Sequence, residues 1–303
     1  MKPCFNYQDT LAASEKIHWR VEEIIGGDKQ LDFTKPFMPE SLARVTDLTF
    51  LNAEEQRLVN QIRGNAYLCI FGLVEEFILP FVLDHARQQL AGNDYRVRAL
   101  LQFASEEAKH IHLFKCFREE FARGFGKPCA VIGPPEAIAD FVLSHHPLAV
   151  AMAILHIEWM TQKHYTESIQ DNQQLDPQFK SLLKHHWMEE AQHAKLDTLM
   201  VEALAANCSD AEIEQAVEDY LKIGGFLDEG LKQQTTFDLE SLLCATGRDL
   251  SPDEQQAFIE KQHQANRWSY LGSGMTHPNF LATLENLSPA ARKRIEAVAP
   301  VFC

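Results

Sequence analysis

The stretch HHWMEEAQH, residues 185–193, contains the side chains on which the fold and the chemistry of this chain depend. His186, Glu190 and His193 occupy positions i, i+4 and i+7, so on a helix they lie on one face. The other residues of that face are mainly apolar, which predicts that this polar triplet is buried. A buried carboxylate beside two histidines requires a cation or hydrogen-bond donors as partners.

A second segment, SEEAKH at residues 105–110, repeats the centre of this pattern, because Glu107 and His110 have the spacing of Glu190 and His193. One Glu-x-x-His pair is weak evidence, since both residue types are common on helix surfaces. Two such pairs on separate helices, with one further glutamate on each of two other helices, form the ligand set of a di-iron or di-manganese four-helix bundle.

The two further glutamates lie on apolar helices that precede each pair. Glu158 precedes Glu190 by almost the same number of residues as Glu76 precedes Glu107, so Glu…Glu-x-x-His occurs twice. Glu75 is the alternative to Glu76, because this helix is apolar on nearly all sides and periodicity does not choose between the neighbours. In both Glu-Glu-Ala segments, the second glutamate is the one that lies three residues before the histidine. By analogy, this slightly favours the second glutamate here, Glu76.

Three kinds of polar residue near these motifs have different predicted roles. His186 lies one turn before Glu190 on the same face, so we expect it to be a further metal ligand. Glu106 and Glu189 point away from that face, and we expect them on solvated helix surfaces. Asp197 follows the second histidine by one turn, where it could accept a histidine N–H, although a surface position is equally compatible.

The whole chain is predicted to be all-α, because no segment shows convincing period-two alternation. A four-helix bundle is predicted for residues 52–206, followed by a helical extension of the same domain over 207–303. Residues 1–51 are expected to pack on the bundle. Caps and prolines place its helices at about 52–89, 94–123, 147–169 and 177–206.

Composition restricts the partners and the location that we expect. A net charge of −15 argues against nucleic acid and against an anionic membrane surface. The longest apolar run, 66–83, contains Glu75 and Glu76, which predicts a buried core helix and no membrane span. Seven scattered cysteines and a start without an apolar signal core indicate reduced thiols and a cytoplasmic location.

Taken together, these residues resemble the ferritin-like di-iron carboxylate superfamily over roughly residues 52–206. The added histidine, which gives His-x-x-x-Glu-x-x-His, is similar to the seven-ligand variant of the p-aminobenzoate N-oxygenase family. The resemblance implies a ferritin-like bundle that holds two iron ions. The implied ligands are Glu76 (or Glu75), Glu107, His110, Glu158, His186, Glu190 and His193.

The resemblance also implies a non-haem di-iron oxygenase, with O2 as co-substrate, that oxidises a small organic molecule by amine N-oxygenation or hydroxylation. We expect an external electron donor such as a ferredoxin or reductase, because the sequence has neither a dinucleotide-binding glycine motif nor an iron–sulfur cysteine cluster. The alternatives are a ferroxidase or other iron-handling protein, a di-manganese redox enzyme and a binding scaffold with a degenerate site. Carboxylate and imidazole ligands suit iron and manganese alike. The wide apolar helix faces are also compatible with a homodimer.

Overall fold

The computed structural model describes residues 5–303, and this part of the chain consists of helices and loops without a β-strand. The extended backbone in it forms one isolated bridge, between Gly26 and Lys29. The predicted all-α fold with a ferritin-like four-helix core and additional helices at both ends is therefore confirmed.

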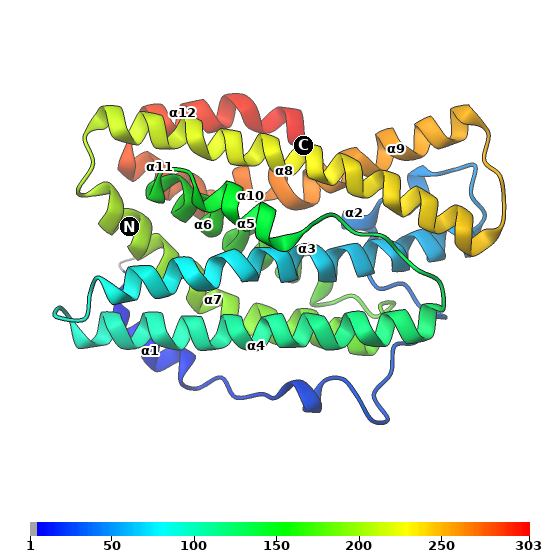
Figure 1. Ribbon diagram of the computed structural model, residues 1–303, viewed down its shortest axis with the longest axis horizontal. Coiled ribbons are helices and arrows are strands. Elements are labelled where there is room, and N and C mark those ends of the chain that lie inside the picture. Colours follow the sequence, from blue (N-terminus) through cyan, green and yellow to red (C-terminus); the bar gives the residue numbers. More distant parts are fainter. Residues whose placement is uncertain (1–4) are drawn as a thin grey trace.

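Four long helices form the centre of the fold (Figure 1). They are α3 (Ala53–Arg87), α4 (Asp94–Phe125), α6 (Pro147–His164) and α7 (Pro177–Ala205). α3 packs along α4, and α6 packs along α7, so the bundle consists of two helix pairs. The pairs meet through α4 and α7, which carry the two Glu-x-x-His motifs.

The ends of α3 and α4 follow local signals in the sequence. Asn52 caps α3, and Glu55 returns a bond to the Asn52 backbone N–H, which completes a capping box. Asn93 caps α4 through its side-chain oxygen. α4 continues past its predicted end at about residue 123, because the glycine that adopts the left-handed conformation is Gly126, with φ of 69°, and not Gly124.

The second pair starts at prolines. Pro147 and Pro177 occupy the first helical turn, where the missing N–H costs nothing. The Asp176 side chain accepts the Phe179 N–H at 2.6 Å and caps α7. α6 ends in a π-helical segment, η3 (Tyr165–Ile169), before the connection to α7.

The N-terminal elements cover the bundle on the α4 side. α1 (Tyr7–Ser14) packs against α4 and α7, and the chain that follows runs along the outside of α4 to η1 (Val21–Glu23) (Figure 1). Two short elements, α2 (Glu40–Ala43) and η2 (Val45–Asp47), then lead into α3.

The last third of the chain adds a second helical layer. α8 (Asp210–Thr246) packs against both α3 and α6, and α5 (Pro135–Leu143) packs against α3. α10 and α11 also contact α6, so this helix is covered on the side that faces away from α7. The remaining elements are α9 (Pro252–Arg267), η4 (Trp268–Gly272), α10 (Ser273–Met275), α11 (Pro278–Leu287), α12 (Pro289–Val298) and η5 (Ala299–Phe302).

α3 is long and apolar enough to span a membrane, with a mean hydropathy of 1.9 over its most apolar stretch. In the folded chain, 72% of that stretch is buried inside the protein. Burial of this kind is what the central helix of a packed bundle requires, because the helix is surrounded by neighbours on several sides.

Candidate metal centre

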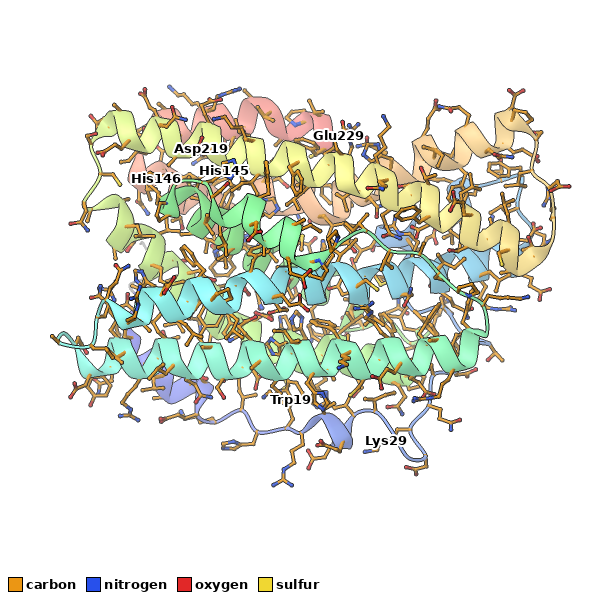
Figure 2. The ribbon with its side chains drawn as sticks, in the orientation of Figure 1. Trp19, Lys29, His145, His146, Asp219 and Glu229 are labelled. Carbon is orange, nitrogen blue, oxygen red and sulfur yellow. The ribbon has the colours of Figure 1, made fainter. Side chains whose placement is uncertain are left out.

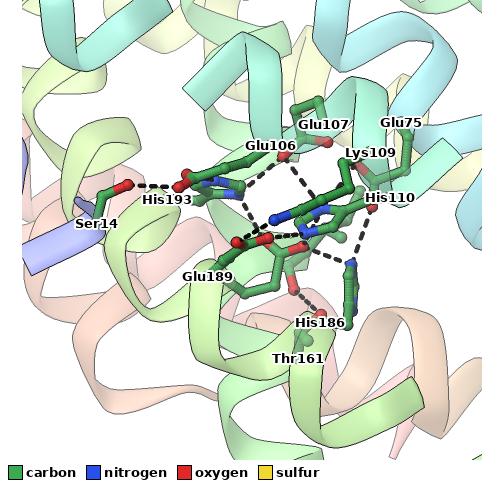
Figure 3. A network of polar contacts seen from close by, with 12 residues as sticks. Ser14, Glu75, Glu106, Glu107, Lys109, His110, Thr161, His186, Glu189 and His193 are labelled. Carbon is green, nitrogen blue, oxygen red and sulfur yellow. Dashed lines mark hydrogen bonds and ion pairs between the residues drawn. The ribbon is translucent and has the colours of Figure 1, made fainter. Parts of the chain in front are cut away.

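The two Glu-x-x-His motifs meet between α4 and α7 (Figure 3). Glu107 and His110 project from α4, Glu190 and His193 project from α7, and all four side chains are fully buried. His193 Nδ1 lies 2.8 Å from Glu107 Oε1 and 2.7 Å from Glu190 Oε2. One histidine therefore contacts the carboxylates of both helices, as the three-residue spacing on each helix allows.

α3 contributes Glu75, and not Glu76, to this cluster. Glu75 is only 2% exposed, and its Oε1 lies 3.1 Å from His186 Nε2. Glu76 is exposed and lines an open cleft on the outer side of α3. The preference for Glu76 was therefore wrong. Neighbouring helix residues point about 100° apart, and the packing of α3 against α4 decides which of the two faces inward.

The structure places His186 inside the cluster, between α3 and α7. Its Nε2 lies 2.5 Å from Glu190 Oε1, in addition to the contact with Glu75. The rings of Phe71 and Phe114 pack edge-on against the imidazole, with centroids 5.5 Å and 5.0 Å away. These aromatic contacts hold the imidazole in place, with its Nε2 toward the carboxylates.

α6 contributes Glu158, which is buried beside Glu190. Burial and the neighbouring Glu190 carboxylate raise the pKa of Glu158 well above its usual range. Burial acts on Glu190 in the same direction, but His186 and His193 outweigh it and hold the pKa of Glu190 well below its usual range. The two carboxyl groups of this pair are therefore shifted in opposite directions, and Glu158 is the one that burial makes easier to protonate.

Two overlapping sets of donor atoms are each compact enough to hold a metal ion, with all atoms of a set within 4.8 Å of one another. The first set consists of Glu75, His110, His186 and Glu190. The second consists of Glu107, His110, Glu190 and His193. Because His110 and Glu190 belong to both sets, the two possible metal positions are adjacent. Glu158 belongs to neither set but lies next to Glu190.

We expected Glu106 and Glu189 on solvated helix surfaces, and this prediction was wrong. Both residues are buried around the cluster. His193 Nε2 donates to Glu106 at 2.9 Å, and His110 Nε2 donates to Glu189 at 2.9 Å (Figure 3). The glutamate immediately before each Glu-x-x-His motif thus orients the histidine of the other helix. Such a carboxylate fixes the ring so that its second nitrogen, here Nδ1, faces the cluster.

These two outer carboxylates have donors of their own. Ser14 Oγ, from α1, donates to Glu106 at 2.5 Å, and Lys109 Nζ donates to Glu189 at 2.5 Å. Periodicity within a single helix does not predict this pairing, because the histidine partner of each glutamate lies on the opposite helix. The available signal was the repetition of the complete Glu-Glu-Ala-x-His segment, which includes the first glutamate in both copies.

Asp197 neither accepts a histidine N–H nor lies on the surface. Glu106 already accepts the outer N–H of His193, and Asp197 is fully buried. Neither of its carboxylate oxygens has a hydrogen-bond partner among the described residues. Burial raises the pKa of Asp197 well above its usual range, because the charged form loses its hydration inside the bundle.

The N-terminal segment closes the outer side of the cluster, although it carries none of the clustered residues. The Trp19 ring stacks on the imidazole of His110, with centroids 6.1 Å apart and planes inclined by 6°. Lys109 Nζ lies 3.9 Å from the centroid of the Trp19 ring. Figure 2 shows Trp19 on the segment that passes outside α4. These contacts shield His110 and its acceptor Glu189 from water.

The surrounding carboxylates raise the pKa of two of the three clustered histidines, His110 and His193, whereas burial lowers the pKa of His186. Burial lowers the pKa of His110, but the carboxylates of Glu190 and Glu189 outweigh this effect and raise it to about 9. Burial also lowers the pKa of His193, and Glu190 and Glu107 more than compensate, so this pKa lies well above its usual range. Bound cations would satisfy the same carboxylates in place of these protons.

Unpartnered donor atoms point to the same conclusion. Buried polar atoms in proteins nearly always have a partner. Two divalent cations would match the charge of the four clustered carboxylates, and carboxylate and imidazole donors suit iron and manganese. In the described part of the chain, the buried atoms without a hydrogen-bond partner include one oxygen of each of three carboxylates, Glu75 Oε2, Glu107 Oε2 and Glu158 Oε2.

Neither a known protein family nor a curated protein sequence matches this chain. Among solved structures, it is similar to variants of an R2-like ligand-binding oxidase. One, with an aerobically reconstituted Fe/Fe cofactor, is 15% identical, with 89% of this chain and 94% of that chain covered and a TM-score of 0.45. Another, with an anaerobically reconstituted Mn/Fe cofactor, is 14% identical at the same coverage, with a TM-score of 0.47. Similarity at this level assigns neither a family nor a metal, so the assignment of this centre depends on its own geometry.

Proposed function

We propose that this chain is a non-haem di-metal oxygenase that uses O2 to oxidise a small organic molecule. The observation that carries the proposal is the buried cluster of carboxylates and imidazoles, which forms two adjoining sets of donor atoms and leaves several carboxylate oxygens without a hydrogen-bond partner among the described residues. Iron is the metal we propose, with manganese as the alternative. The residues that would hold the two ions are Glu75, Glu107, His110, Glu158, His186, Glu190 and His193.

The metals would supply the electrons that O2 needs for reduction, which no side chain of the cluster provides. The chain itself orients and shields the ligands. Glu106 and Glu189 fix the rings of His193 and His110, and Trp19 covers the outer side. A cluster closed in this way keeps bulk water away from a reactive centre.

Protons also have defined places in this arrangement. In the metal-free chain, the pKa of Glu158 beside Glu190 is raised, and the surrounding carboxylates raise the pKa of His110, so both groups favour their protonated forms. Ligands must be deprotonated to bind a metal, so metal uptake would release these protons. Uptake of two divalent ions would thus leave the cluster close to neutral, which a buried site requires.

The finer assignment to amine N-oxygenation or hydroxylation is supported by His186. Its contacts with Glu75 and Glu190 add a third imidazole to the six-residue pattern that the two helix pairs duplicate. This addition resembles the seven-ligand pattern of the p-aminobenzoate N-oxygenase family. We further propose that reducing electrons come from an external donor such as a ferredoxin or reductase, and that the protein works in the cytoplasm.

Metal content provides the decisive test. The purified full-length chain is loaded anaerobically with iron(II) and manganese(II) in competition, and bound metal per chain is measured by elemental analysis. We expect close to two irons per chain. Glu75→Gln should lose metal, whereas Glu76→Gln is a matched control that changes the exposed neighbour and should retain it. O2 uptake by the reduced, loaded protein should fall in parallel with metal content.

Other outcomes would select a different function. A folded chain without stoichiometric transition metal would refute the oxygenase proposal and favour a binding scaffold. Preferential manganese binding would favour a di-manganese redox enzyme. A large cage-like assembly that accumulates many irons per chain would favour iron storage.

A further inference from the structure

Residues 15–20 form a short strap that links α1 to η1 and passes over the metal centre on the outer side of α4 (Figure 2). The strap has no regular secondary structure, and Trp19 is its one buried residue. In the described chain, its hydrogen bonds to the bundle are limited to the exposed pair between Glu15 and Arg98 of α4. A segment that is fastened so weakly can open locally while the helices beneath it stay folded.

Trp19 holds this strap against the centre. Its indole ring stacks on the imidazole of His110 and also contacts His185, with centroids 6.1 Å and 5.7 Å away. Lys109 Nζ lies 3.9 Å from the centroid of the indole. The indole Nε1 is buried and has no hydrogen-bond partner within residues 5–303. Lifting the ring would lose these contacts but would let the N–H bond to water, so packing alone favours the closed state.

Lys109 connects the strap to a buried carboxylate, that of Glu189 (Figure 3). Lys109 Nζ donates to Glu189 Oε1 at 2.5 Å, and His110 Nε2 donates to Glu189 Oε2 at 2.9 Å. The side chain of Lys109 is 26% exposed, whereas that of Glu189 is fully buried. The ammonium group therefore balances the buried charge from the surface side, and it can move into water once Trp19 no longer covers it. Glu189 then needs another cation as its partner.

The other sides of the centre are closed by helices. α6 lies beneath α8, α10 and α11. On the outer side of α3, the cleft that contains Glu76 is separated from the centre by Phe114, which is 1% exposed and packs against His186. A path through either side requires a helix or a core phenyl ring to move. The strap side requires the displacement of a few residues that belong to no helix.

We propose that metal ions enter and leave the centre beneath this strap. Trp19 lifts off His110, and Glu189 exchanges the ammonium group of Lys109 for the incoming divalent cation. Lys109 keeps its proton and turns into water during this exchange. The inference rests on the proposed function in one respect, because it requires a centre that binds metal. It does not require oxygenase activity, so it can be tested without a substrate.

The kinetic test uses iron(II), the full-length chain and anaerobic buffer. Uptake by the metal-free chain is stopped at intervals with excess ferrozine, and release from the loaded chain is followed as ferrozine captures the iron. Trp19→Ala should accelerate uptake and release by the same factor, roughly tenfold, because an entrance alters the barrier and leaves the affinity unchanged. Trp19→Phe keeps a smaller ring and should accelerate both less. Trp268→Ala is the control, since Trp268 is a partly buried tryptophan of η4 that also contacts a lysine, Lys163.

A second test separates the role of Glu189 in metal entry from its role in orienting His110. Glu189→Gln should slow iron uptake several-fold, since an amide attracts a divalent cation less strongly than a carboxylate does. Glu106→Gln is the matched control, because Glu106 orients His193 in the same way but is covered by Ser14 of α1. The lower metal affinity of Glu106→Gln should appear as faster release, with uptake unchanged.

Several outcomes would overturn the inference. Gly72→Leu fills part of the cleft beside Phe114 and should leave both rates unchanged, so slower uptake in this variant would place the entrance at the cleft. Unchanged rates in folded Trp19→Ala would refute the entrance beneath the strap. Faster release without faster uptake would show that Trp19 only positions His110. Failure of the proposed function would appear differently, as a native chain that takes up no stoichiometric iron.

Discussion

The two helix pairs of the bundle are near-repeats that differ at one informative position. Each pair supplies a lone glutamate and a Glu-x-x-His motif to the cluster. Four residues before the glutamate of the motif, α4 carries Phe103 and α7 carries His186. Phe103 stacks on His193 with centroids 4.0 Å apart, whereas His186 directs its Nε2 at Glu75. The same backbone position thus provides an apolar cover for one histidine and an additional donor at the other metal position.

The pairs also differ in what covers them. The outer side of α3 and α4 opens into the cleft that contains Glu76, and the outer side of α6 lies beneath α8, α10 and α11. A duplicated ligand set has therefore been placed in an asymmetric surrounding. One side of the bundle carries an open cleft, and the other is covered by C-terminal helices.

The strongest test of the duplication is Glu190→Gln. Glu190 belongs to both sets of donor atoms, so its loss should affect both metal positions and lower metal affinity by at least about 100-fold, more than the loss of an outer carboxylate. Elemental analysis should show close to no metal per chain. Retention of one tightly bound ion would show that Glu190 serves only one position.

The difference between the pairs can be removed with His186→Phe, which gives α7 the residue type of α4. Because His186 approaches Glu75 on one side of the cluster, we expect one metal position to weaken about 10- to 100-fold while the other is retained. Competition with a metal-sensitive dye measures the two affinities. Equal weakening of both positions would contradict the assignment of His186 to one of them.

The similarity of the pairs can be tested with Glu106→Gln and Glu189→Gln. Both carboxylates accept a histidine N–H at 2.9 Å, so each variant should lower metal affinity by a similar factor of about ten. The same dye competition applies. A large effect from one variant and none from the other would show that the reciprocal arrangement is not functionally symmetric.

The pH dependence of the metal-free chain should reveal the crowded carboxylates. The pKa of His110 is raised to about 9, so the stability gained from its protonation is complete below about pH 6.5 and is lost as the pH rises toward 9. Urea unfolding should show this loss, on the order of 3 kcal/mol. Metal affinity should change in the opposite direction, since binding requires the neutral ring. A flat profile over this range would contradict the raised pKa.

The smallest effect is expected at Asp197, which lies outside the duplicated set. Its raised pKa means that the stability it contributes is complete only at low pH and is lost as the pH rises above about 4. Asp197→Asn removes this penalty and should stabilise the metal-free chain by about 1–2 kcal/mol at neutral pH. Asp171→Asn, at an exposed position, is the control for urea unfolding and should have no comparable effect.

Much of the fold was predictable because its signals are local. Asn52 and Asp176 mark helix starts through side-chain caps that depend on residues three positions away. The repeated Glu-x-x-His spacing placed Glu107 with His110 and Glu190 with His193, and the structure brings all four together. The end of α4 was predicted one glycine too early, because Gly124 and Gly126 are equivalent as local signals.

The sequence by itself determined the helices, the duplicated motif and the inward face of α7, because periodicity within one helix is enough for each of them. Only the tertiary structure decided between Glu75 and Glu76 and paired Glu106 and Glu189 with the histidines of the opposite helix. It also buried Asp197. These outcomes depend on the rotation of one helix against another, and that rotation is set by contacts between residues far apart in the chain.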